Sequence, residues 1–322
     1  MTETNAVAPV RIPPLDKTLC PLALGGDYFG SDPWGKQRTE LWAALETALE
    51  KGINHFDTAS DYGDGQSERF LGEFFTGRRE QVCIASKISL DEMNADLMLD
   101  RINQSLSRLK TDVIDIYYIH WPRKGKDLRP LMEGLERARL QGKIRAVGVS
   151  NFSVAQMKQI SEAGQINVHQ LGYNLFWRVA EKEIIPYCRE QNIAVVTYST
   201  IAQGILTGKF PRRLKIGPDD RRTDAVYFNE SIWLYVYEGV EQLKELAKQV
   251  ECPLTHLAIR WVLNQSGINT AVVGGRRPAQ VEENIAALRG DIPSQIFEQM
   301  SEISDTVIQQ IPDMTNMYGY YP

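Results

Sequence analysis

The sequence predicts an α/β fold of the (β/α)8 barrel type (TIM barrel), in which eight parallel strands form a closed barrel surrounded by helices. Short runs rich in Val, Ile and Ala alternate along the chain with stretches of helical periodicity. Eight strand–helix units fill most of the 322 residues, which is the size of such a barrel. The rival architecture, an open doubly wound sheet, normally carries GxGxxG after its first strand, and LGGDYFG at 24–30 has a different spacing.

Each predicted strand is short and apolar without alternation, as expected of parallel strands that are buried on both faces. Successive parallel strands need a right-handed crossover, so the stretches between them are expected to be helices outside the barrel. The eight runs are PLALGG (21–26), GINHFD (52–57), VCIASK (82–87), VIDIYYIH (113–120), IRAVGVSN (144–151), INVHQ (166–170), IAVVTYS (193–199) and INTAVVG (268–274).

The helical stretches show an apolar face and recognisable ends. Residues 39–52 have apolar side chains at helical spacing and end on Gly52, which suits the position just after a helix. Residues 153–164 begin with Ser153 and Gln156 at the spacing of a capping box and end on Gly164. Two further helices are predicted, at 238–250 and 278–288.

Composition narrows the functional class. The chain is 43% hydrophobic and 24% charged, so it can bury a large core. Its formal net charge of -5 gives no excess of positive charge, so neither nucleic acid nor a membrane surface is expected as a partner. The four cysteines are scattered without a CxxC pair, so no disulfide framework and no metal site are predicted.

One domain is expected, because no low-complexity linker interrupts the chain. Residues 1–16 are predicted to be a flexible tail, and residues 17–322 a single barrel domain with a C-terminal substrate loop. The start of the sequence lacks the pattern of a secretory signal, and no apolar run reaches 18 residues. Together with the scattered cysteines, these features favour the cytoplasm. The oligomeric state is left open.

Polar or glycine residues follow every predicted strand after the first. Since the active site of a (β/α)8 barrel lies at the C-terminal ends of its strands, these side chains are expected to converge at one mouth. They are Asp57, Lys87, His120, Ser150 with Asn151, Gln170, Tyr198 with Ser199, and Gly274 with Gly275 and Arg276.

Four side chains suggest acid–base chemistry at that mouth. Lys87 and Asp57 are expected to pair, and a positive charge beside Tyr62 would lower the pKa of its phenol below its usual value of about 10. Tyr62 would then serve as a proton donor to a carbonyl oxygen. On the other side of that oxygen, His120 is expected to donate a hydrogen bond. No Ser–His or Cys–His relay is evident in the sequence, so hydride from a cofactor is the nucleophile that fits.

The chain resembles the aldo-keto reductases along nearly its whole length. The resemblance rests on motifs in the order and spacing of that family, among them NHFDTASDYGDGQSE, ASK, YYIHWP, IRAVGVSNFS, YNLF, GILTGK and VVGGRRPAQVEENIAAL. It implies an oxidoreductase that reduces aldehydes or ketones to alcohols, reversibly, with a catalytic tetrad of Asp57, Tyr62, Lys87 and His120.

The resemblance also implies that NAD(P) lies extended across the barrel mouth without a Rossmann fold. NADPH is expected rather than NADH. Gln280 occupies the place where many members of the family have an arginine for the 2′-phosphate, but Arg276 and Arg277 stand just upstream, at the start of the predicted helix near Pro278, and their guanidinium groups can clamp a phosphate. The implied cofactor-binding residues are Ser150, Asn151, Gln170, Tyr198, Ser199, Leu206, Gly208, Lys209, Gly274, Gly275, Arg276, Gln280, Glu283 and Asn284.

The substrate pocket departs from the family's pattern, because GGDYFG follows the first strand where many members carry a tryptophan. Aromatic side chains are expected to line it, namely Tyr28, Trp121, Phe176 and Trp177, with further aromatics in the terminal MTNMYGYYP; packing inside the protein is the alternative role for each. Two alternative functions stay open. One is a cofactor-sensing regulatory or binding subunit, as in the β subunits of potassium channels, and the other uses Lys87 as a Schiff-base nucleophile.

Overall fold

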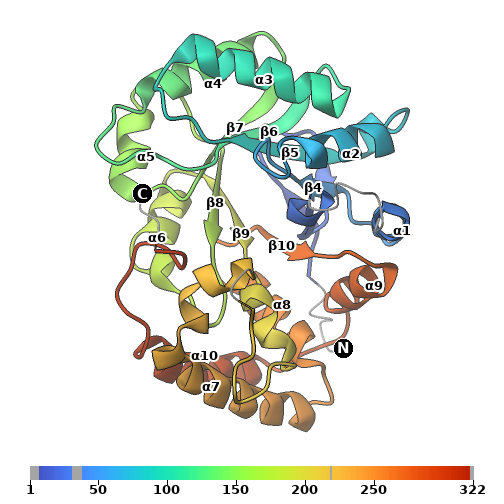
Figure 1. The fold of residues 1–322 in the computed structure, drawn as a ribbon, viewed down its shortest axis with the longest axis vertical. Helices are drawn as coiled ribbons and strands as arrows, with labels where there is room; N and C mark the ends of the chain where they lie inside the picture. The colour runs from blue at the N-terminus through green and yellow to red at the C-terminus, as the bar shows by residue number, and fades with distance from the viewer. Residues whose placement is uncertain (1–6, 31–37, 218–219, 320–322) are drawn as a thin grey trace.

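The computed structural model describes residues 7–30, 38–217 and 220–319. Within them, eight parallel strands form a closed barrel in the order β10-β3-β4-β5-β6-β7-β8-β9, with helices around it (Figure 1). The predicted (β/α)8 fold is confirmed. The barrel strands are β3 (Leu22–Gly25), β4 (His55–Asp57), β5 (Cys83–Ile88), β6 (Ile114–Ile119), β7 (Ile144–Ser150), β8 (Val168–Gly172), β9 (Ala194–Tyr198) and β10 (Thr270–Gly274).

The helices lie outside the barrel and bury their apolar faces against it. In Figure 1, α3 and α4 lie side by side at one end of the view and α7 and α10 at the other. The described helices are α1 (Arg38–Glu50), α2 (Gln66–Phe74), α3 (Ala95–Leu109), α4 (Arg129–Leu140), α5 (Val154–Ile160), α6 (Ile184–Glu190), α7 (Glu230–Gln249), α8 (Leu254–Leu263), α9 (Pro278–Ala286) and α10 (Ser294–Ile308).

Helix ends follow local capping, and two predicted ends were wrong. The capping box of Ser153 and Gln156 is present at the start of α5, but that helix ends at Ile160 rather than near Gly164. A Cβ at Gly164 would stand 2.6 Å from the Glu136 side chain, so this glycine allows close packing on α4 rather than ending a helix. Helix α7 begins at Glu230 instead of 238, because Asn229 caps its first turn.

The predicted tail boundary at residue 16 was also wrong. Residues Val10–Arg11 (β1) pair antiparallel with Thr18–Leu19 (β2), so a folded hairpin precedes the barrel. Its Ile12 and Leu15 are buried and belong to an apolar cluster with side chains of the barrel interior, including Ile116 and Val196. The burial of these two side chains fixes the hairpin against the barrel. Residues 1–6 of the predicted tail lie outside the described part of the chain.

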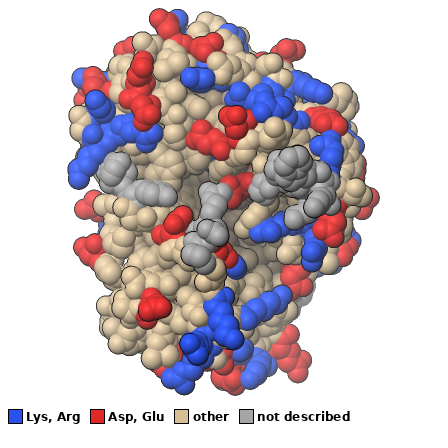
Figure 2. Space-filling model, viewed as in Figure 1, with Lys and Arg blue, Asp and Glu red and all other residues tan. Residues whose placement is uncertain are grey.

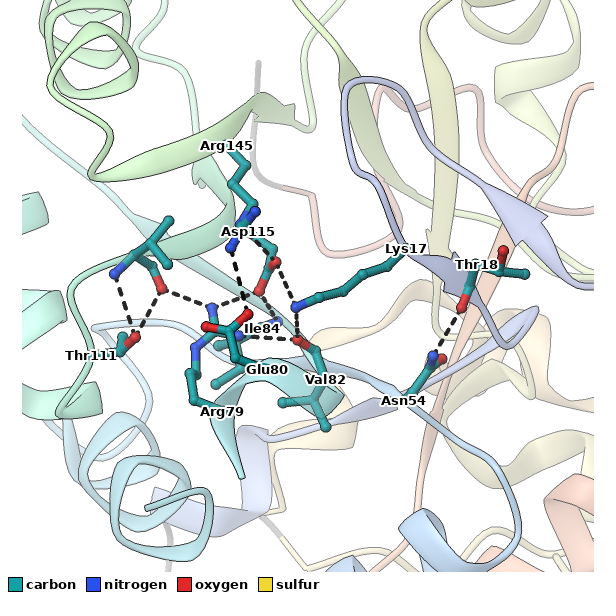
Figure 3. Close-up of polar contacts among 11 residues, drawn as sticks. Lys17, Thr18, Asn54, Arg79, Glu80, Val82, Ile84, Thr111, Asp115 and Arg145 are labelled. Carbon is teal, nitrogen blue, oxygen red and sulfur yellow. Dashed lines mark hydrogen bonds and ion pairs between the residues drawn. The ribbon is translucent and has the colours of Figure 1, made fainter. Parts of the chain in front are cut away.

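A buried carboxylate ties the hairpin to three barrel strands (Figure 3). Asp115 of β6 is fully buried and accepts hydrogen bonds from Lys17 Nζ (3.2 Å), Arg79 (2.6 Å) and the backbone N–H of Ile84 in β5 (2.9 Å). Arg145 of β7 lies 3.4 Å from the same carboxylate. The network satisfies a charge that would otherwise be costly to bury.

Two further observations concern the distribution of surface charge and the length and apolarity of the helices. On the face in Figure 2, acidic and basic side chains are interspersed. Among the described residues, no helix is both long enough and apolar enough to cross a membrane.

Candidate active site

The structure brings the four predicted catalytic residues together at the C-terminal ends of neighbouring strands. Asp57 is the last residue of β4, Lys87 lies near the end of β5, and His120 directly follows β6. Tyr62 lies in the loop between β4 and α2, a segment with positive φ at Gly63, Asp64 and Gly65. The strand pairing β4–β5–β6 therefore places their side chains next to one another.

Lys87 is the centre of this group. Its side chain is fully buried, and its Nζ lies 2.5 Å from Asp57 Oδ1, 2.7 Å from the Thr58 carbonyl oxygen and 3.4 Å from the Tyr62 hydroxyl. The ammonium thus donates to a carboxylate and a carbonyl while it points at the phenol. A protonated amine in an ion pair has no free lone pair, which disfavours the alternative role of Lys87 as a Schiff-base nucleophile.

The predicted lowering of the Tyr62 pKa is not what the structure supports. Burial raises the pKa of the phenol well above its usual value, and the negative charges of Asp57 and Asp27 add to this. Burial is the main reason, because it disfavours the charged phenolate, and the positive charge of Lys87 is already paired with Asp57. Tyr62 is therefore a neutral phenol at neutral pH, with its proton available for donation.

The residues at the ends of β7, β8 and β9 join the same network. Gln170 donates from Nε2 to Asp57 Oδ2 (2.7 Å), so it holds the carboxylate oxygen that Lys87 leaves free. Asn151 accepts a hydrogen bond from the Tyr198 hydroxyl (2.7 Å) and donates to the His120 carbonyl oxygen (3.1 Å) and to Ser150 Oγ (3.1 Å). The predicted tetrad and four of the predicted cofactor residues, Ser150, Asn151, Gln170 and Tyr198, are therefore joined by hydrogen bonds.

His120 has a partner that the sequence reasoning missed. Its Nδ1 lies 3.2 Å from Asp61 Oδ2, and its ring meets the Tyr62 ring edge-on, with 5.8 Å between centroids. Burial lowers the pKa of His120, against the opposing effect of Asp61. The signal was present in the sequence, since Asp61 directly precedes Tyr62, but only the fold shows that it faces His120.

The C-terminal segment also reaches the mouth. The Tyr318 ring is nearly parallel to that of Tyr198, with 6.5 Å between centroids, and the Tyr318 hydroxyl lies 3.2 Å from Ser199 Oγ. Gln203 donates to the same hydroxyl (2.6 Å). Neither Gln203 nor Tyr318 was singled out individually in the sequence, because aromatic and amide residues in loops carry no spacing signal.

The end of β10 and the start of α9 form a second part of the mouth. A Cβ at Gly274 would meet no atom within 4 Å, so the backbone there is open, whereas Gly275 is buried. Asn284 donates to the Gly274 carbonyl oxygen (2.9 Å), and Gln280 accepts from the Arg276 N–H (2.9 Å). These contacts order the first turn of α9, whose N-terminus suits an anion.

The remaining predicted cofactor residues differ in exposure. Leu206 is fully buried at the end of a short 3₁₀ segment, Gly208 follows it with φ of 69°, and Lys209 is exposed. Glu283 is an exposed carboxylate 3.3 Å from His256 of α8. The structure thus gives Leu206 a packing role, while Lys209 presents its charge to solvent.

The predicted pocket residues do not share one environment. Phe176 is fully buried and packs near Gly239 of α7, so it belongs to the core and lines no open surface; Trp177 is also buried. Trp121 is partly exposed beside the His120 ring. Tyr28 lies under the Arg276 guanidinium, 3.4 Å from its ring centroid, which places it toward the α9 end. In the described ranges, no cluster of three or more His, Cys, Asp or Glu residues suits a metal ion.

Comparison with known proteins gives one family. Residues 21–305 match the model of the aldo/keto reductase family. The chain is 35% identical over 274 residues to the aldo-keto reductase YhdN of Bacillus subtilis (strain 168), an alignment that covers 81% of this chain and 82% of that protein. It is 30% identical over 315 residues to the NADH-specific methylglyoxal reductase of Escherichia coli (strain K12), covering 89% and 96%.

A solved structure agrees with these matches. The glycerol dehydrogenase AKR11B4 from Gluconobacter oxydans superposes with a TM-score of 0.86 at 29% sequence identity, over 92% of this chain and 95% of that one. The barrel and the order of its strands are therefore shared with a solved oxidoreductase across nearly the entire chain.

Proposed function

Since the chain belongs to the aldo/keto reductase family, a family of oxidoreductases, we propose that it reduces aldehydes or ketones to alcohols reversibly, with a nicotinamide cofactor. The observation that carries the proposal is the buried Lys87–Asp57 pair with the Tyr62 hydroxyl 3.4 Å from the ammonium, at the mouth of the barrel. Tyr62 is the general acid in reduction and, once deprotonated, the base in oxidation.

The residues at the mouth suit a nicotinamide cofactor. The side-chain oxygens of Asn151 and Gln170 can accept hydrogen bonds from a carboxamide, and the ring of Tyr198 is partly exposed beside them. The open backbone at Gly274 and the N-terminus of α9 suit a phosphate group. When bound, the cofactor supplies the hydride that the side chains themselves lack.

The chain's own residues manage the proton and the position of the substrate. Tyr62 keeps its proton at neutral pH because burial raises its pKa, and it gives that proton up as negative charge develops on the substrate oxygen. Lys87 stabilises the phenolate that remains, and Asp57, held by Gln170, keeps the ammonium in place. His120 lies beside Tyr62 and contacts the same oxygen from the other side.

We propose NADPH as the preferred cofactor. Arg276 and Arg277 precede α9 and are exposed, and the Arg276 guanidinium lies over the Tyr28 ring beside the N-terminus of α9, where guanidinium groups suit a phosphate. The Escherichia coli relative is named as specific for NADH, so the preference has to be measured. A hydrogen bond to a charged group contributes about 1.5–3 kcal/mol. Arg276→Ala should therefore weaken NADPH binding roughly 10- to 100-fold and leave NADH binding nearly unchanged. Equal weakening of both, or a wild type that favours NADH, would refute this site.

The decisive experiment is turnover of a panel of aldehydes and ketones, including methylglyoxal, with NADPH and with NADH. Reduction is followed by the loss of absorbance of the reduced nicotinamide. Cofactor-dependent turnover that disappears in Tyr62→Phe supports the proposal. If borohydride trapped a substrate on Lys87 without oxidation of the cofactor, the proposal of hydride transfer would be wrong and Schiff-base chemistry would take its place. Cofactor binding without turnover of any carbonyl compound or alcohol would favour the cofactor-sensing role.

A further inference from the structure

We propose that Asp61 is a positioning residue that holds the proton of neutral His120 on Nδ1, so that the ring presents a lone pair to the substrate until it becomes an imidazolium. The inference rests on the proposed function and adds a residue and a protonation step to it. His120 then accepts a hydrogen bond from an alcohol when it is neutral, and it donates one to a carbonyl oxygen when it is protonated.

The geometry fixes the ring in this orientation. Asp61 Oδ2 lies 3.2 Å from His120 Nδ1, and Asp61 Oδ1 accepts from the Ser60 hydroxyl (3.2 Å), so both carboxylate oxygens have partners. The backbone of His120 is held as well, since its N–H donates to the Ile88 carbonyl oxygen (2.9 Å) and its carbonyl accepts from Asn151 (3.1 Å). The ring therefore turns one nitrogen to Asp61, with Tyr62 against its edge.

The chemistry follows from the donor inventory of the two groups. An ionised carboxylate only accepts hydrogen bonds, so the nitrogen that faces Asp61 is the one that carries hydrogen. Neutral imidazole has a single N–H, which leaves Nε2 with a lone pair. Nε2 can donate to a carbonyl oxygen only after the ring gains a second proton.

The charges around His120 set the pH at which the ring binds that second proton. The charged and titratable groups that face the ring are Asp57 of β4, Asp61 and Tyr62 of the β4–α2 loop, and Lys87 of β5. Burial lowers the pKa of His120, and Asp61 opposes this shift, while Lys87 and Asp57 act in opposite directions. The pKa of Asp61 itself lies below its usual value, because the effect of its burial is outweighed by hydrogen bonds, chiefly from His120. Asp61 thus stays ionised and is the main group that favours the imidazolium.

The sign of the pH dependence can be worked out. Below the pKa of His120 the ring is charged and donates, so the contribution of His120 to reduction is present there and is lost as pH rises through that pKa. Its contribution to alcohol oxidation runs the other way. Removing the charge of Asp61 moves the midpoint of both changes to lower pH.

The first test reads the tautomer directly and needs no turnover. The chain has four histidines, so an imidazole ¹⁵N NMR spectrum is simple, and His120→Gln identifies the His120 signals by their loss. We expect the proton on Nδ1 in the wild type and in Asp61→Asn, whose amide oxygen still accepts, but not in Asp61→Leu. A wild-type ring with its proton on Nε2, or an unchanged tautomer in Asp61→Leu, would overturn the proposal.

The second test compares pH profiles of kcat in both directions. Losing the opposite charge of Asp61 at this distance should lower the pKa of His120 by about one unit or more. At a pH above the His120 midpoints of both the wild type and Asp61→Asn, the variant should therefore reduce a carbonyl about tenfold more slowly. Asp64→Asn removes the same charge from the same loop and should follow the wild type. Superimposable pH profiles of kcat for Asp61→Asn and Asp64→Asn would contradict the proposal. If the wild type reduced no carbonyl compound, the proposed function would fail, and the NMR result would still decide the role of Asp61.

Discussion

Tyr62 is the residue on which the proposed chemistry depends most. The change Tyr62→Phe removes the phenolic proton but keeps the ring against His120. Loss of a general acid slows a reaction roughly 10²- to 10⁴-fold, so carbonyl reduction should fall by at least about a hundredfold. Cofactor binding, measured by fluorescence titration, should be nearly unchanged. Tyr235→Phe, on the exposed face of α7, is the matched control and should behave as the wild type.

Lys87 combines catalysis with stability, and Lys87→Met should affect both. The substitution leaves Asp57 buried with Gln170 as its hydrogen-bond donor, and breaking a buried ion pair costs about 3–5 kcal/mol. It also removes the positive charge next to the Tyr62 hydroxyl, which raises the pKa of Tyr62 further. We therefore expect a lower urea midpoint and an alcohol oxidation profile displaced to higher pH. Unchanged unfolding and an unchanged profile would show that Lys87 has neither role.

At the scale of elements, the β1–β2 hairpin closes one end of the barrel. Ile12 is fully buried against side chains of the barrel interior. Truncation of a buried isoleucine costs about 2–5 kcal/mol, because apolar contacts are lost and a cavity is left. Ile12→Ala should therefore lower the free energy of unfolding by about that amount in urea titration. Leu140→Ala at the exposed end of α4, where the side chain is 76% exposed, should change it by no more than about 0.5 kcal/mol.

At the scale of the whole molecule, the Asp115 network and the proposed catalytic residues lie at opposite ends of the barrel. Asp115 joins the hairpin to β5, β6 and β7 at the end away from Tyr62 and His120. Asp115→Asn should lower the free energy of unfolding by about 3 kcal/mol, the lower end of the range for a broken buried ion pair. The loss is at the lower end because Lys17 and Arg79 keep their hydrogen bonds to the Val82 carbonyl oxygen. Cofactor affinity and kcat at a temperature where the variant is folded should be unchanged. A loss of cofactor affinity would mean that the two ends are coupled.

Much of this could be predicted from the sequence, because it is local. Strand composition and helix periodicity depend on neighbours in the chain, so the (β/α)8 fold follows from them, as do the capping box at Ser153 and the Pro278 start of α9. Polar residues after successive strands predicted where Asp57, Lys87 and His120 meet, since parallel strands bring their C-terminal ends to one mouth.

The burial and charge pairing of the site residues depend on contacts between segments that are far apart in the chain, and no local sequence pattern predicts such contacts. Only the fold shows that the Tyr62 phenol is buried and faces the negative charges of Asp57 and Asp27, which reverses the expected shift of its pKa. The sequence determined that the strand-end residues Asp57, Lys87 and His120 reach the mouth. The tertiary structure decided that Phe176 packs in the core and that Asp61 faces His120, because burial and charge pairing are properties of the three-dimensional surroundings.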